Sequence, residues 1–314
     1  MHQTEGDFQF MRAATQPSLY RNGEVLIERD PLGNTAASRG VALETHTLAV
    51  TDARIHKLRM TCEHNGFELL HAPLEHPIDF YDHDDVVRYY YPECAALVAE
   101  LTGAQAFAFD HNVRSAGGKQ EQARIKGGQD VQGPAHVVHG DYTLRSAPER
   151  LAQLALPPSG NDTLVGFRTD ALVPDALLAR AQQSRFAIIN VWRNIDSQPV
   201  ATHPIALCDS QTVTPEDSVV FEIHYPDRIG ENYFSKFSPE HRWYYYPAVA
   251  QEEALIIKQW DSAGLLAGSD GEQGDGGAPE RPCTFSFHSA FVAADTPADA
   301  RDRWSIEVRC VVIY

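Results

Sequence analysis

The chain of 314 residues lacks a long apolar run, a surplus of basic residues and a cysteine framework. No stretch approaches the ~18 consecutive apolar residues of a membrane-spanning helix. The first residues also lack the basic start and apolar core of a signal peptide. The 26 Lys and Arg residues are outnumbered by 43 Asp and Glu residues, which gives a net charge of −17. Nucleic acids and anionic membranes are recognised through basic patches, so we expect neither as a partner.

Cysteine is scarce, and its five positions show no pairing pattern. The number is odd and no Cys-x-x-Cys occurs, which favours reduced thiols over disulfides or a structural zinc site. We therefore expect a cytoplasmic protein. The composition, with 43% hydrophobic and 22% charged residues, is typical of a globular protein with a substantial core.

The hydrophobic pattern predicts a mainly β protein with flanking helices. Acidic residues at 84–85 open a predicted helix that Gly103 ends, Ser146 is predicted to cap a second helix, and Pro174 begins a third. From Phe186 onward, short apolar runs alternate with turn residues, as in an antiparallel barrel. The predicted strands span residues 106–109, 186–192, 219–225, 243–246, 254–260, 284–292 and 305–314.

Two segments differ from the predicted barrel. Residues 1–80 carry only short extended stretches and are expected to form an N-terminal extension that packs on the core, formed by residues 81–314. The run 264–282 is dominated by Gly, Asp, Glu and Ala, and we expect a loop with few buried contacts. A lid over a site and an inert surface insertion are both consistent with its composition.

The tripeptide His139-Gly140-Asp141 is the most informative motif. Residues two apart in a strand point to the same face, so His139 and Asp141 can bind one metal ion side by side. A second imidazole from another strand would complete two histidines and one carboxylate. This set leaves adjacent positions open and favours non-haem Fe(II) that reacts with O2. His-x-Asp is common by chance. The prediction of a metal site therefore depends mainly on the order of the motifs, in which a distant histidine and then an Arg-x-Ser follow the tripeptide.

The distal ligand is predicted to be His288. Polar and aromatic residues alternate over 284–288, so a strand would turn the three polar side chains toward the site and both phenylalanines into the core. His241 is the rival, although an aromatic run follows it and no Arg-x-Ser lies beyond it at a similar spacing. His224 is a third candidate, and its more common role is that of a core histidine.

Arg303 and Ser305 are predicted to hold the far carboxylate of a 2-oxoacid co-substrate. Arginine forks a carboxylate through two hydrogen bonds, and the serine hydroxyl adds a third. Arg309 shares their strand parity and is the rival anchor, with a salt bridge to Glu307 as its structural alternative. Arg193 either lines the same pocket or donates structural hydrogen bonds, and the sequence does not separate these roles.

Eight segments along the chain, some of them around the residues above, are informative in combination. They are Thr102-Gly103-Ala104, Phe109-Asp110-His111-Asn112-Val113-Arg114, the residues 136–143 around the metal motif, Asn190-Val191-Trp192-Arg193, Ala206-Leu207-Cys208-Asp209, the residues 241–247, His288-Ser289-Ala290-Phe291 and the residues 303–309. Together they resemble the CmcJ/NvfI family over roughly residues 80 to 314. That family groups a cephamycin methoxylation protein with fungal gibberellin desaturase and endoperoxide-forming oxygenase relatives.

The resemblance implies an oxygenase that uses Fe(II), 2-oxoglutarate and O2 on a double-stranded β-helix, the jelly-roll or cupin-like fold. It implies a small-molecule substrate, in natural-product metabolism, without separating hydroxylation, desaturation, cyclisation and endoperoxide formation. Two positions depart from the expected pattern: Gly140 stands where a bulkier residue is expected, and Trp304 where an acidic one is expected. Both are expected to alter the shape of the pocket.

Two other functions are consistent with the same residues. One is a β-barrel that binds a small molecule without redox chemistry and uses the histidines structurally. The other is a cupin-like isomerase or hydrolase in which the metal ion acts as a Lewis acid. Arg303-Trp304-Ser305 favours a carboxylate co-substrate over that second alternative. The sequence does not indicate an oligomeric state.

Overall fold

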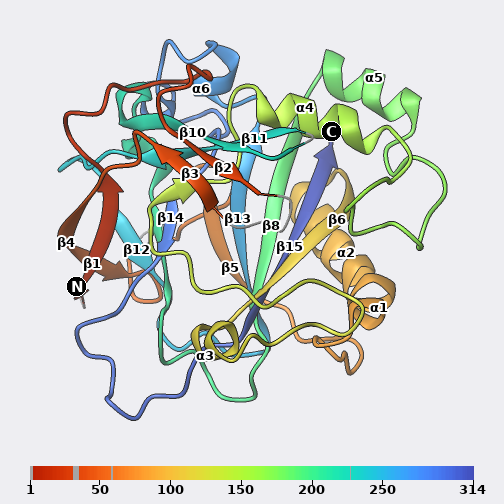
Figure 1. The fold of residues 1–314 in the computed structure, drawn as a ribbon, viewed down its shortest axis with the longest axis horizontal. Helices are drawn as coiled ribbons and strands as arrows, with labels where there is room; N and C mark the ends of the chain where they lie inside the picture. Colours follow the sequence, from red (N-terminus) through yellow and green to blue (C-terminus); the bar gives the residue numbers. More distant parts are fainter. Residues whose placement is uncertain (1–2, 31–34, 58, 227) are drawn as a thin grey trace.

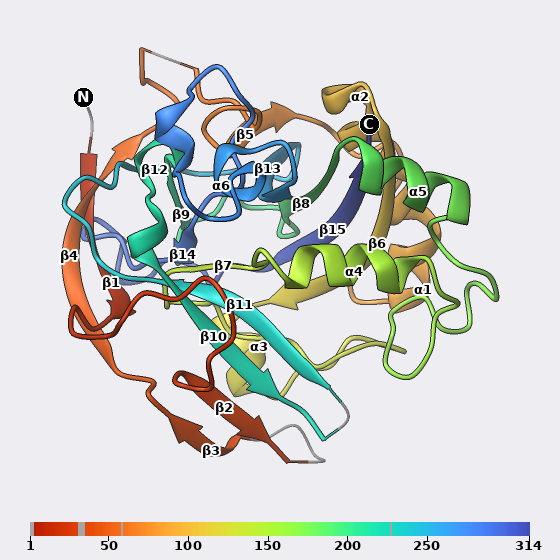
Figure 2. The same cartoon turned by 90° about the horizontal axis from the view of Figure 1, so that it is seen from above.

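The computed structural model describes residues 3–30, 35–57, 59–226 and 228–314 as two facing β-sheets with helices beside them (Figure 1). The larger sheet has the order β1-β4-β12-β9-β14-β7-β11-β10-β2-β3. Its strands are β1 (Gln3–Met11), β4 (Leu43–Asp52), β12 (Trp243–Tyr245), β9 (Ile205–Cys208), β14 (His288–Ala290), β7 (His139–Gly140), β11 (Ile229–Ser235), β10 (Ser218–His224), β2 (Leu26–Arg29) and β3 (Thr35–Arg39). At one end of this sheet, β10, β11, β2 and β3 extend away from the rest of the molecule (Figure 2).

The smaller sheet has the order β5-β13-β8-β15-β6. Its strands are β5 (Phe67–His71), β13 (Glu253–Asp261), β8 (Phe186–Asn194), β15 (Ser305–Ile313) and β6 (Gln105–Arg114). Every residue of β8 is buried, because this central strand is covered on both faces. The mainly β fold predicted from the alternating pattern is therefore confirmed.

The helices flank the sheets, and the longest covers the outer face of the smaller sheet by packing against β6, β15 and β8. They are α1 (His83–Asp85), the π-helix η1 (Val86–Tyr90), α2 (Tyr91–Thr102), α3 (Ala116–Gln120), α4 (Ser146–Leu154), α5 (Asp175–Gln183) and α6 (Leu265–Gly268). Three 3-10 turns are η2 (Ser210–Thr212), η3 (Pro215–Asp217) and η4 (Asp275–Gly277). None of the helices in the described ranges is long and apolar enough to cross a bilayer.

The helix ends test the capping predictions. The helical run that follows Asp82 ends at Gly103, whose φ of 67° lies in the left-handed region, as predicted. The predicted cap at Ser146 is wrong. Thr143 caps α4 instead, because its Oγ1 accepts hydrogen bonds from the Arg145 and Ser146 amides at 3.2 and 3.0 Å.

The N-terminal strands extend both sheets. In the larger sheet, β1 pairs with β4, which in turn pairs with β12, and β2 pairs with β10. In the smaller sheet, β5 pairs with β13. All five cysteines are buried and none forms a disulfide within the described residues.

The segment 264–282 is more ordered than its composition indicates. It contains α6 and η4, and Asp275 in its middle is only 4% exposed. The Asp275 carboxylate accepts hydrogen bonds from the Leu265 amide at 2.9 Å, the Thr284 amide at 2.6 Å and the Ser210 hydroxyl at 2.9 Å. The expectation of few buried contacts is therefore wrong, because one carboxylate ties this segment to its neighbours.

Candidate metal centre

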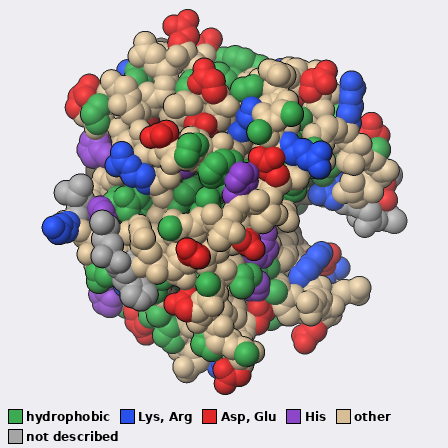
Figure 3. All heavy atoms as spheres, turned by 90° about the vertical axis from the view of Figure 1, so that its left-hand side faces the viewer, with side chains coloured by type: hydrophobic (Ala, Val, Ile, Leu, Met, Phe, Trp, Pro, Cys, Tyr) green, Lys and Arg blue, Asp and Glu red, His purple; other side chains and the backbone are tan. Residues whose placement is uncertain are grey.

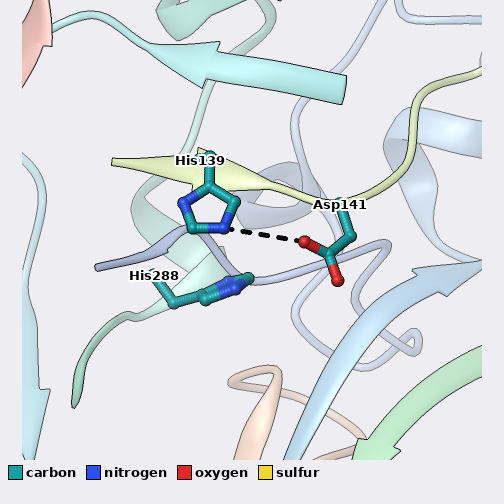
Figure 4. Close-up of side chains that lie close together, drawn as sticks. All are labelled: His139, Asp141 and His288. Carbon is teal, nitrogen blue, oxygen red and sulfur yellow. Dashed lines mark ion pairs between the residues drawn. The ribbon is translucent and has the colours of Figure 1, made fainter. Parts of the chain in front are cut away.

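His139, Asp141 and His288 lie together between the two sheets (Figure 4). His139 is on β7, Asp141 follows directly, and His288 opens β14 opposite His139 in the strand pair. One ligand atom from each side chain lies within 4.8 Å of the others, and His139 Nε2 is 3.6 Å from Asp141 Oδ1. Residues separated by almost 150 positions thus converge because two short strands pair.

Hydrogen bonds fix the tautomer of both imidazoles. His139 Nδ1 is 2.8 Å from the Val137 carbonyl, and His288 Nδ1 is 3.2 Å from the Ser286 carbonyl. A carbonyl only accepts, so each Nδ1 must carry the proton and donate. Each Nε2 therefore keeps its lone pair, which is the arrangement usual for metal-bound histidines.

The protonation states also suit a divalent cation. Burial lowers the pKa of His139 to about 4, with the nearby His288 adding to the shift, and burial lowers the pKa of His288 as well. Burial alone would raise the pKa of Asp141, but Arg309 and the two imidazoles lower it below its usual value. At neutral pH the site therefore offers two neutral imidazoles and one carboxylate, the forms that bind metal.

The smaller sheet positions the carboxylate. Asn190 on β8 donates from Nδ2 to Asp141 Oδ2 at 3.1 Å, and Arg309 Nε on β15 is 3.5 Å from the same oxygen. Asp141 Oδ1 is left facing His139. Gly140 between the ligands is explained by packing, because a Cβ there would lie 3.0 Å from the Phe285 ring.

The rival histidines lie elsewhere. His241 Nε2 is 3.2 Å from Asp217 Oδ2, and His224 Nε2 is 2.8 Å from Glu222 Oε2. Neither belongs to the group formed with His139, so the geometry favours His288 as the distal ligand.

The strand predicted over 284–292 is shorter than expected, because β14 spans only His288–Ala290. Phe285 and Phe287 are in the core as predicted. The polar residues before His288 do not face the site: Thr284 Oγ1 donates to Asp275, and Ser286 Oγ donates to the Cys208 carbonyl at 2.7 Å. That part of the prediction is wrong, since these hydroxyls satisfy buried acceptors.

A small cavity of about 20 Å³ adjoins the two imidazoles. Its walls include Trp192, Arg303, Glu307 and Arg114, besides His139 and His288. Arg303 is 3% exposed, and its guanidinium donates to the His203 carbonyl. In the described ranges its Nε has no hydrogen-bond partner and no carboxylate lies within ion-pair distance. Burial and, to a smaller extent, the neighbouring cation Arg114 together lower the pKa of Arg303 to about 9.

Two further predicted residues, Ser305 and Arg309, differ in their surroundings. Ser305 is buried beside Arg114, and its hydroxyl is 3.5 Å from the Arg114 carbonyl oxygen. Arg309 is already matched by carboxylates, because it lies 3.0 Å from Asp110 and 3.2 Å from Glu307 as well as beside Asp141.

Arg193 does not line this cavity, and its contacts favour the structural role, one of the two that the sequence left open. Its Nε donates to the Tyr90 hydroxyl at 2.9 Å and its Nη1 to the Gln251 carbonyl at 2.5 Å. Asn190 and Trp192 have the opposite parity on β8 and face the site.

Trp304 points away from the cavity as well, although it was expected to alter the pocket. Its ring lies against Gly118 and edge-on to Tyr81, with centroids 5.3 Å apart. Sequence reasoning missed Arg114 and Asn190 as site residues. Each lies at one end of a segment that resembles the family, and that position was the available signal.

The chain is similar to known proteins in sequence and in fold. A family model described as an oxidoreductase/YMDC permease-like domain matches residues 19–313. An uncharacterized protein in the dcmA 3' region of Methylophilus leisingeri is 40% identical over 198 residues, which cover 61% of this chain and 91% of that protein. The Fe(II)/2-oxoglutarate-dependent dioxygenase nvfI of Aspergillus novofumigatus is 31% identical over 227 residues, or 71% of this chain and 66% of that protein. The solved structure of the iron and alpha-ketoglutarate-dependent endoperoxidase NvfI shares the fold, with a TM-score of 0.71 at 23% identity over 99% of this chain and 98% of that chain.

Proposed function

The chain belongs to the oxidoreductase family of these relatives, which include an Fe(II)/2-oxoglutarate-dependent dioxygenase, and we propose that His139, Asp141 and His288 are its iron ligands. The protein is an oxygenase that depends on Fe(II), 2-oxoglutarate and O2 and oxidises a small molecule. One observation supports the ligand proposal above all: the partly buried His139 and the buried His288 both present Nε2 lone pairs beside an ionised carboxylate. Two imidazoles and one carboxylate leave adjacent positions for a chelating co-substrate and O2.

The co-substrate is proposed to occupy the cavity beside the imidazoles, with its far carboxylate on Arg303. A buried guanidinium without a carboxylate partner is costly, and a ligand carboxylate would compensate its charge. Ser305 and Arg114 would stand next to that carboxylate. Because the cavity measures only about 20 Å³, the arginine side chains would have to shift to admit 2-oxoglutarate.

With its co-substrate and O2, the bound iron would supply an oxidant strong enough to remove hydrogen from an unactivated C–H bond. The residues that surround the three proposed ligands would hold them in place and exclude water from the site. Asn190 and Arg309 would fix one oxygen of Asp141, and Val137 and Ser286 would fix the imidazoles. Phe285 and Phe287 would close the floor of the site as buried rings.

We further propose that residues 81–314 form a double-stranded β-helix and that residues 1–80 are an extension whose strands add to both sheets. Support for this comes from the two facing sheets and from the ligands on paired central strands of the larger one. The substrate is proposed to belong to natural-product metabolism. Hydroxylation and desaturation are the reactions named for several relatives.

The proposal is tested by anaerobic titration of the metal-free protein with Fe(II) and 2-oxoglutarate. The chelate should give a weak visible charge-transfer band, and O2 should then convert 2-oxoglutarate to succinate. Zn(II) should occupy the same ligands without supporting succinate formation. A protein that forms no band and no succinate with Fe(II) would contradict the proposed function.

A further inference from the structure

A wide cleft lies near the candidate metal centre. Its volume is about 1350 Å³, which exceeds the roughly 300–1,000 Å³ of most ligand pockets. It is bounded by α4, by the inner residues of β6, and by parts of segments 124–130 and 156–167. In the space-filling view the molecule is deeply hollowed at the right-hand side, with charged side chains on both rims (Figure 3).

The inner end of the cleft is one side chain from a proposed ligand. Asp110 lines the cleft, and its Oδ2 is 3.0 Å from Arg309 Nη1. The same guanidinium lies 3.5 Å from Asp141 through Nε. The Arg309 guanidinium is therefore the one side chain between Asp110 at this end of the cleft and the proposed ligand Asp141.

In the described ranges, four arginines and four aspartates line this cleft, a balanced set in a chain whose net charge is −17. Arg88, Arg124 and Arg150 all line it. Two of them form long, exposed pairs, Arg88 with Asp84 at 3.6 Å and Arg124 with Asp130 at 3.7 Å. Exposed pairs of this kind contribute little, so both arginines can exchange their partner for a ligand.

Arg150 is the most informative of the three. In the described ranges it forms no ion pair with a carboxylate: its guanidinium donates to Gln153 Oε1 at 3.3 Å and lies 4.8 Å from the centre of the Phe109 ring. Arg150 therefore presents a positive charge near the inner end of the cleft.

We propose that this cleft binds the substrate and that the substrate is an organic anion whose acidic group pairs with Arg150. The inference rests on the proposed function, because it uses the metal centre to define the inner end of the cleft. A carboxylate on Arg150 gains charge-assisted hydrogen bonds in a groove with low-dielectric walls. The rest of the substrate would extend over the largely polar surface of the cleft, which fits an apolar hydrocarbon poorly.

Two dyes of the same shape test the charge requirement. 1-Anilinonaphthalene-8-sulfonate is an anion, and N-phenyl-1-naphthylamine is its uncharged counterpart. Both are titrated by fluorescence into the protein loaded with Fe(II) and 2-oxoglutarate without O2. Arg150→Gln should weaken binding of the anionic dye about tenfold and leave the neutral dye unchanged. Arg150→Lys should recover part of the lost affinity.

Arg145→Gln is the matched control, because Arg145 stands at the start of the same helix, pairs with Glu149 at 2.7 Å and does not line the cleft. It should leave both dyes unaffected. Equal affinity of the anionic dye for Arg150→Gln and for the unaltered protein would overturn the inference, as would an equal loss for both dyes. The charge-transfer band of the unaltered protein separates the two hypotheses: its absence defeats the proposed function, whereas the dye titration alone decides the charge of the ligand.

Discussion

Two clusters of buried charge in this protein differ in how completely they are paired. One lies around Lys258 on β13, which is fully buried. Lys258 Nζ is 2.9 Å from Asp261 and 3.3 Å from Glu63, and Arg185 is 2.5 Å from Asp261 and 2.9 Å from Glu63. Two cations and two carboxylates thus form a closed network, and each charge has two opposite partners.

The cluster at the metal centre is open. Arg309 is surrounded by three carboxylates, yet Arg303 has no carboxylate partner among the described residues, and two imidazoles present unused lone pairs. Buried polar groups normally have hydrogen-bond or ion-pair partners, so an unpaired guanidinium beside two free lone pairs indicates a binding site for a ligand. A closed network stabilises the fold, whereas an open one binds something that the chain itself does not supply.

Removing a ligand from the open cluster should have the largest effect on function and a small effect on stability. Asp141→Ala and His288→Ala should each abolish the charge-transfer band and succinate formation, because two ligands do not hold Fe(II) at working concentrations. Anaerobic absorption spectroscopy measures this, and urea unfolding checks the fold. His241→Ala is the parallel variant. Loss of iron there with retention in His288→Ala would reverse the assignment of the distal ligand.

Breaking the closed cluster should have the opposite result. Asp261→Ala removes the partner shared by Lys258 and Arg185 and leaves a buried ammonium poorly compensated. The expected loss of unfolding free energy is about 3–5 kcal/mol, measured by urea denaturation. Glu63→Gln should cost less, since the Glu63 side chain is 44% exposed. An Asp261→Ala protein of unchanged stability would show that the network contributes nothing to the fold.

Arg303 is the cation of the open cluster that has no carboxylate partner among the described residues. Arg303→Ala should raise the KM for 2-oxoglutarate, because it removes a forked, charge-assisted bond of about 2–4 kcal/mol. That loss corresponds to roughly 30- to 1000-fold. Iron binding without co-substrate should remain. Steady-state succinate assays give the value, and a defect in Arg309→Ala with a normal Arg303→Ala would move the anchor to Arg309.

The sequence predicted the open cluster better than the closed one. His139 and Asp141 are two positions apart, so strand geometry alone brings them together. His288 needed the order of later residues as well. Lys258 gave no such signal, since its partner Glu63 lies 195 positions away in the sequence and a lysine in a strand usually indicates an exposed edge.

The alternation of side chains along a strand does not predict every side-chain orientation in this protein. All nine residues of β8 are buried, so alternation could not say whether Asn190 or Arg193 faces the site. In the segment 264–282, Gly and Ala predicted a loop, but the chain there forms α6 and η4, and the role of Asp275 depends on amides that come near it only in the folded chain. Side chains that pair across long distances in sequence are therefore the part that pattern reasoning cannot supply.

The last prediction concerns the loss of stability at acid pH. His111 on β6 is 5% exposed, its Nδ1 is 2.8 Å from the Tyr91 hydroxyl, and its ring stacks on His83. Burial lowers the pKa of His111 to about 4, although Asp110 opposes the shift. As pH falls below about 6.5, the unfolded chain takes up a proton that the folded chain does not. The unfolding free energy should therefore fall by about 1.4 kcal/mol per pH unit until about pH 4.

His111→Gln isolates this contribution, because the difference in unfolding free energy between the variant and the unaltered protein should change between pH 7 and pH 5. Asp261→Ala supplies the contrast. The ammonium and guanidinium around Asp261 overcome the opposing effect of burial and lower its pKa, so its stabilisation is lost only as pH falls below about 4. Its stability difference should stay constant from pH 7 to pH 5. Parallel pH profiles for the two variants would contradict the assignment of His111, since the closed network does not titrate in that range.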